Sequence, residues 1–102
     1  MNYYLHPSPI ALPIIRLFIL NPHGECRFAL YDLEKQGYGW NLLCCVKYLW
    51  RLGRKTPDLK PDLAKVIQYV GFELENPDSP LDMTTLLQIK ADCVKLLKQQ
   101  IK

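Results

Sequence analysis

The sequence predicts an all-α fold, a compact bundle of about four helices preceded by an apolar N-terminal arm. Apolar residues recur at helical spacing in the segments after residue 24, and no alternating run is bounded by hairpin turns. The 102 residues, 49% of them hydrophobic, fit one domain with a modest core. We expect an arm over residues 1–24 and a helical domain over residues 25–102.

The arm contains the most apolar run of the chain, Ile10 to Leu20. This run is too short to span a bilayer, is interrupted by Pro13 and Arg16, and lacks the positively charged lead of a signal peptide. We therefore expect a cytoplasmic protein without membrane contact. The run must be covered by protein, either by its own domain or by another subunit, and we predict a homo-oligomer built through the arm or the final helix.

Four helices are expected after the arm. The first covers Glu25 to Gln36 and ends at Gly37, with Phe28, Ala29 and Leu33 facing inward and Tyr31 as a further candidate. The third starts near Pro61 and runs to about Glu75, with an apolar stripe of Leu63, Val66, Ile67 and Val70. The connector before it offers Thr56 as a cap with Pro57 after it. The fourth starts at Ser79-Pro80-Leu81-Asp82 and runs to about Gln100, with a stripe of Leu86, Leu87, Ile89, Val94, Leu97 and Ile101.

The second helix, Asn41 to Lys55, carries most of the functional information. Asn41 is a suitable N-cap, and Gly53 offers a left-handed exit. The period places Leu42, Cys45, Val46 and Leu49 on one apolar face. A second face collects residues three and four apart, namely Cys44, Lys47, Tyr48, Arg51 and Lys55.

That second face belongs to a stretch that contains cations and no acid. From Lys35 through Pro57 there are five lysines and arginines and no Asp or Glu. A solvated helix usually mixes signs, because opposite charges one turn apart are stabilising and like charges are not. Either an anionic ligand lies opposite these cations, or carboxylates of a neighbouring helix neutralise them. The formal net charge of +3 is too small to predict general nucleic-acid binding.

Metal and catalytic motifs are absent. The four cysteines form no C-x-x-C pair, and His6 and His23 lack ligand spacing, so buried reduced thiols are expected and a zinc site is not. Helix capping explains Asp58 and Asp62 better than metal binding, and Glu73 is the remaining acid near the basic region. No Walker A loop, dinucleotide fingerprint or nucleophile with a base is present, so we expect no cofactor and assign no catalytic residue.

Two helices together carry a recognisable pattern. It consists of Lys47, Tyr48, Arg51, Gly53, Arg54 and Lys55, followed by Asp62, Leu63, Lys65 and Tyr69. This pattern resembles a small phage-borne family that includes a coliphage nucleoside monophosphate kinase without a P-loop. The resemblance covers Leu43 to Val70, about a quarter of the chain. It departs at Leu43, Cys44 and Cys45, where the family has Gly-Asn-Ala, and at Val66, where the family has Ala.

The resemblance and the basic face together predict a nucleotide-binding protein of phage type, acting in nucleotide metabolism or in sequestering a nucleotide signal. The alternatives are a nucleoside monophosphate kinase and a non-catalytic protein-interaction module. In the binding hypothesis Lys47 and Lys65 act as point charges for phosphate, Arg51 acts as a forked donor, and a tyrosine provides a stacking surface. The candidate ligand-binding residues are Lys47, Tyr48, Arg51, Arg54, Lys55, Lys65 and Tyr69.

Overall fold

The computed structural model describes residues 2–100 and shows five α-helices, with no strand among those residues. The predicted all-α fold is therefore confirmed, with a short helix inside the arm as the fifth. The elements in chain order are α1 (Leu12–Ile15), α2 (Cys26–Lys35), α3 (Trp40–Trp50), α4 (Lys60–Leu74) and α5 (Met83–Gln99). None of these helices combines the length and apolar character that crossing a membrane requires.

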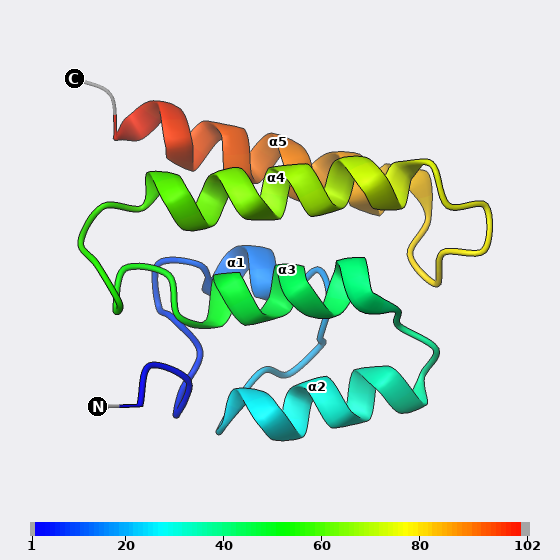
Figure 1. The fold of residues 1–102 in the computed structure, drawn as a ribbon, viewed down its shortest axis with the longest axis horizontal. Coiled ribbons are helices and arrows are strands. Elements are labelled where there is room, and N and C mark those ends of the chain that lie inside the picture. The colour runs from blue at the N-terminus through cyan, green and yellow to red at the C-terminus, as the bar shows by residue number, and fades with distance from the viewer. Residues whose placement is uncertain (1, 101–102) are drawn as a thin grey trace.

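Helix α3 lies at the centre of the bundle. In Figure 1 it runs between α4 on one side and α2 on the other, and α5 packs against α4. Its predicted apolar face is confirmed, because Leu42, Cys45, Val46 and Leu49 are all fully buried. Trp50, also fully buried, donates its indole N–H to the carbonyl of Gly24 at 3.2 Å. This hydrogen bond fixes the start of α2 against the end of α3.

The arm folds back onto its own domain, the first of the two coverings expected for it. Ala11, Ile14, Ile15 and Phe18 belong to the same buried core as α3, α4 and α5. Among the large apolar side chains of the run, only Ile10 and Leu20, at its two ends, are exposed. The arm thus removes its apolar surface from water without a second subunit, and the homo-oligomer stays a prediction without support from the arm.

Several predicted helix boundaries are wrong, and each has a local reason. α3 ends at Trp50 and not at Lys55, because Leu52 bonds back to Leu49, one residue nearer than the helical partner, and the chain turns at Gly53 with φ +80°. Asn41 is not the N-cap. Gly39 occupies that position, and the Asn41 amide instead donates to Glu73 of α4 at 3.4 Å.

The starts of α4 and α5 also differ from the expectation. Thr56 caps no helix, since α4 begins at Lys60 after Leu59, with Pro61 second in the helix. α5 begins at Met83 and not at Ser79, because the Asp82 carboxylate accepts the Thr85 N–H at 2.7 Å and so satisfies a free first-turn donor. Ile101, placed in the apolar stripe of this helix, lies outside the described residues.

Three residues expected to face inward are exposed instead, namely Phe28, Tyr31 and Leu87. α2 packs mainly on α3, so only a narrow stripe through Cys26 and Leu33 reaches the core. Phe28 and Tyr31 lie outside that stripe, and cationic side chains cover their rings: Arg27 stands 4.7 Å from the centre of Phe28 and Lys35 stands 4.3 Å from the centre of Tyr31. On α5, the buried stripe runs through Leu86, Ile89 and Cys93, one residue out of phase with Leu87.

Candidate functional site

Helices α3 and α4 pack antiparallel and bring the two halves of the sequence pattern together. Three side-chain contacts, from one end of the pair to the other, join Arg51 to Asp62, Tyr48 to Tyr69 and Asn41 to Glu73. From the first of these contacts to the last, the residue numbers decrease on α3 and increase on α4. Side chains three and four residues apart on each helix therefore meet across one continuous outer face. We call this surface the α3–α4 face and define it by Trp40, Lys47, Tyr48, Arg51, Lys65, Tyr69 and Phe72.

Arg51 has a carboxylate partner from the neighbouring helix. Its Nη2 lies 2.8 Å from Asp62 Oδ1, and its Nε lies 3.3 Å from Asp62 Oδ2, which makes a two-pronged ion pair. Its Nη1 also donates to the Tyr4 hydroxyl at 3.0 Å. Burial lowers the pKa of Arg51, but the hydrogen bonds to Asp62 and Tyr4 outweigh burial and raise it above the ordinary value. For Arg51, the alternative that a carboxylate of a neighbouring helix neutralises the cation is therefore correct.

The same contact changes the interpretation of Asp62. It caps no helix and lies buried under Arg51 at 5% exposure. Asp58 does bond the start of α4, since its carboxylate accepts the Lys60 N–H at 3.0 Å. Glu73 is buried against Asn41. Among residues 2–100, no group of three His, Cys, Asp or Glu side chains has the arrangement of a metal site.

Aromatic rings form the middle of the α3–α4 face. The Tyr48 and Tyr69 rings are stacked, with centroids 6.2 Å apart and planes 17° apart, and Phe72 meets Tyr69 edge-on at 6.2 Å. The Arg51 guanidinium lies 4.9 Å from the centre of Tyr48. Burial raises the pKa of the Tyr69 phenol, and the neighbouring Cys44 and Tyr48 add to that rise. Tyr69 is therefore a neutral phenol at physiological pH, available to pack on another flat group.

Lys47 differs from Arg51 because its ammonium is exposed and forms no ion pair with any residue in the described part of the chain. It lines a pocket of about 440 Å³ at the junction of α3, the start of α2 and the N-terminal segment. The pocket is lined by Asn2, Tyr4, Glu25, Cys26, Arg27, Leu30 and Lys47. Lys47 therefore lines this pocket, and the next residue on α3, Tyr48, belongs to the stacked pair.

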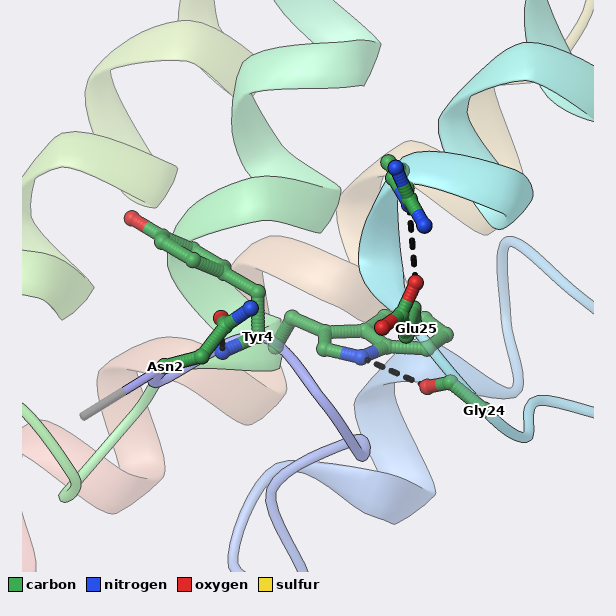
Figure 2. Close-up of polar contacts among 6 residues, drawn as sticks. Asn2, Tyr4, Gly24 and Glu25 are labelled. Atoms are coloured by element: carbon green, nitrogen blue, oxygen red, sulfur yellow. Dashed lines mark hydrogen bonds and ion pairs between the residues drawn. The ribbon is translucent and has the colours of Figure 1, made fainter.

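The far wall of the pocket contains the second cation. Arg27 is directed by Glu25, whose carboxylate it meets at 2.8 Å while its side chain stays 76% exposed. Figure 2 shows the Tyr4 ring pointing away from Glu25, with Asn2 beside it, and the N–H of Tyr4 bonding the Asn2 side chain. The Cys26 N–H bonds the Tyr4 carbonyl, so the start of α2 holds this wall in place. Burial raises the pKa of Cys26 to about 12 although Lys47 lowers it, so this thiol stays neutral.

The last two candidate cations of the central segment differ from each other. Arg54 donates to the backbone carbonyls of His6 and Pro7 and so fastens the N-terminal segment. The buried Ser8 hydroxyl adds a bond to the Leu52 carbonyl at 2.7 Å. Lys55 is exposed beyond the end of α3. Of these two, only Lys55 has a head group left to solvent.

The structure therefore brings together most, but not all, of the candidate residues. Lys47, Tyr48, Arg51 and Tyr69 meet on the α3–α4 face, and Lys65, exposed, lies between Asp62 and Tyr69 on the same side of α4. Two pocket residues, Tyr4 and Arg27, were missed. No spacing rule links residue 4 to residue 51, and Arg27 belongs to another helix with its own acid, so only their placement in space could reveal them.

No protein-family model matches this chain, and neither the curated proteins nor the solved structures include a match to it.

Proposed function

We propose that this protein binds a nucleotide or a similar phosphorylated small molecule, with Lys47 as the central cation. The observation that carries the proposal is that Lys47, an exposed lysine, lines a pocket and directly precedes Tyr48 of the stacked tyrosine pair on α3. A phosphate needs a cation and a nucleobase needs a flat apolar surface. Lys47 provides the cation at the pocket, and Tyr48, the next residue on α3, belongs to the stacked pair.

The pocket suits the phosphate end of such a ligand. Lys47 and Arg27 line it from two helices, while Glu25, its one acid, is already paired with Arg27. Its volume of about 440 Å³ falls in the range that small-molecule sites occupy. A phosphate bound between the two side chains would exchange water for contacts with the Lys47 ammonium, a point charge, and the Arg27 guanidinium, a forked donor.

Arg51 takes a positioning role in this proposal. Three of its N–H groups already donate to Asp62 and Tyr4, so it holds Tyr4 at the pocket and Tyr48 beneath its own guanidinium. The forked-donor role expected of Arg51 passes to Arg27. Lys65, on α4, adds a further positive charge that attracts the phosphate of the ligand.

The resemblance to the phage family is consistent with a nucleotide ligand and suggests a role in nucleotide metabolism or in sequestering a nucleotide signal. The kinase alternative uses the same face. It is separated from simple binding by incubating a nucleoside monophosphate with ATP and measuring formation of the diphosphate. The protein-interaction alternative uses the exposed aromatic residues and predicts no response to nucleotides.

A thermal-shift screen of nucleoside mono-, di- and triphosphates tests the proposal. A ligand that binds only the folded state raises Tm with its concentration, and added salt reduces the shift if phosphate contacts dominate. We expect Lys47→Ala to remove the shift. Lys98→Ala, an exposed lysine near the end of α5, is the matched control and should retain it. Equal shifts in the two variants, or no shift with any nucleotide, would refute the proposal.

A further inference from the structure

Beyond the stacked tyrosines, the α3–α4 face has two exposed aromatic rings, Phe72 and Trp40. Phe72, 50% exposed, contacts Tyr69, and Trp40, 73% exposed, lies two helical turns before Tyr48 on α3. The hydrogen bond from Asn41 to Glu73 ties the two helices together at this end. Trp40 and Phe72 each precede one of those bonded residues, so both rings stand at the same end of the face.

Leaving such large aromatic rings exposed to water does not stabilise the domain itself. Tryptophan and phenylalanine have large apolar areas, and an exposed Trp or Phe gives up the free energy that burial would provide. Exposed apolar side chains that are gathered, and not scattered, mark a binding surface. Tyr48, Tyr69 and Phe72 contact one another in turn, and the exposed Trp40 lies on α3 next to Asn41, which bonds Glu73 beside Phe72.

The charges of this face are positive. Lys47 flanks Tyr48, and Lys65 lies one turn before Tyr69. The two acids that reach the helix pair are buried, Asp62 under Arg51 and Glu73 against Asn41. No Asp or Glu occurs from Trp40 to Arg51 or from Lys65 to Phe72. A partner of this face therefore carries negative charge together with several flat rings.

We infer that the occupant of this face is a short single-stranded oligonucleotide and not a mononucleotide alone. This inference rests on the proposed function, because the first nucleotide takes the site at Lys47, Tyr48 and Tyr69. The next bases then stack along Phe72 and Trp40, while Lys47 and Lys65 meet the intervening phosphates. Alternating rings and cations are the chemistry by which proteins hold single strands without reading their sequence.

Two features favour this partner over other polyanions. A duplex hides the faces of its bases within its own stack, so the aromatic rings of this face would have nothing to contact. An acidic peptide would satisfy the lysines and leave the rings without flat partners. The small number of free cations also fits a strand of a few nucleotides, because each neutralised phosphate needs its own cation.

The test compares the mononucleotide with the 5′-phosphorylated tetranucleotide of the same base, for adenine and thymine, by isothermal titration at two salt concentrations. We expect the tetranucleotide to bind at least about tenfold more tightly, the gain that one stacked base provides. Trp40→Ala and Phe72→Ala should each lower the affinity for the tetranucleotide by a larger factor than the affinity for the mononucleotide. Leu20→Ala, exposed at 95% and far along the chain from this face, is the control for surface substitution.

The outcomes separate the inference from the proposed function. A tetranucleotide that binds no more tightly than the mononucleotide overturns the inference and leaves the proposed function standing. If the tetranucleotide keeps its higher affinity in both Trp40→Ala and Phe72→Ala, the inference is overturned. It is also overturned if a glutamate hexapeptide or duplex DNA binds as tightly as the tetranucleotide. If neither the mononucleotide nor the tetranucleotide binds, the proposed function and the inference both fail.

Discussion

Arg51 of α3 and Asp62 of α4 form a two-pronged ion pair, 2.8 Å at its shorter contact, with the carboxylate almost fully buried. The fold is stable with this carboxylate buried only while its cationic partner is present, because removing the cation leaves an uncompensated charge away from water. Arg51 also donates to the hydroxyl of Tyr4, a residue that lines the pocket. Stability and site geometry thus meet in one contact.

The first prediction is that Arg51→Ala destabilises the fold, by roughly 3 kcal/mol, the loss typical of breaking a buried ion pair from one side. Urea unfolding monitored by circular dichroism measures this. The double variant Arg51→Met with Asp62→Leu removes both charges and should recover most of the loss. A single variant as stable as the parent would show that the pair contributes nothing.

The second prediction concerns the arm. Ile15→Ala should cost about 2 to 5 kcal/mol, because Ile15 is fully buried in the core shared with α3 and α5. Leu20→Ala, at the exposed end of the same run, should leave the urea midpoint unchanged. Equal effects of the two substitutions would contradict the folded-back arm. Light scattering with size exclusion on both variants tests at the same time whether the predicted homo-oligomer exists.

The third prediction is a loss of stability in alkali. Burial raises the pKa of Cys26 and of Cys93 to about 12, above the ordinary thiol value. Above the unfolded-state pKa the unfolded thiols lose their protons while the native thiols keep them. Each such thiol then lowers the unfolding free energy by about 1.4 kcal/mol per pH unit until the native pKa is reached.

Urea midpoints measured between pH 8 and pH 11 test this slope. Cys93→Ala removes one titrating thiol and should give a shallower decline than the parent, whatever its stability at pH 7. A decline of unchanged steepness in Cys93→Ala would show that other groups cause the alkaline loss. The native protein should also resist alkylation by iodoacetamide at pH 8, since all four cysteines are free and buried.

The fourth prediction concerns acid. The Asp82 carboxylate accepts hydrogen bonds from Thr85 at the start of α5, which lowers its pKa below the ordinary value. A lowered pKa means that this contribution to stability is present above the unfolded-state pKa and is lost as pH falls through the native one. Asp82→Asn keeps a capping oxygen but cannot titrate. We therefore expect its urea midpoint to fall less than that of the parent between pH 5 and pH 2, and an identical decline would argue against the cap.

The fifth prediction tests whether Arg54 holds the N-terminal segment against the rest of the domain. Arg54→Ala should expose the backbone of residues 2–9 to hydrogen exchange, because the His6 and Pro7 carbonyls lose their side-chain donor. Lys55→Ala, one residue further on and exposed, is the control and should leave that exchange unchanged. If exchange in this segment is the same in both variants, Arg54 does not fasten it.

The sequence by itself determined that the chain is helical and which face of α3 is buried. The spacing of Leu42, Cys45, Val46 and Leu49 is a local property of α3, and the turns at Gly37 and Gly53 require a left-handed backbone that glycine adopts without strain. Local rules were weaker at helix starts. Gly39 stands at the N-cap of α3 and the Asn41 amide donates to Glu73 of α4, while Asp82 caps α5.

Only the tertiary structure decided the state of the basic face. The cations looked equivalent in sequence, yet one donates to a carboxylate eleven residues away, one fastens the N-terminal segment, and Lys47 remains exposed at a pocket. Tyr4 lines that pocket and accepts a hydrogen bond from Arg51, 47 residues further along the chain. Which carboxylate reaches which cation depends on how helices pack, and packing is set by the whole buried core and not by the spacing within any one helix.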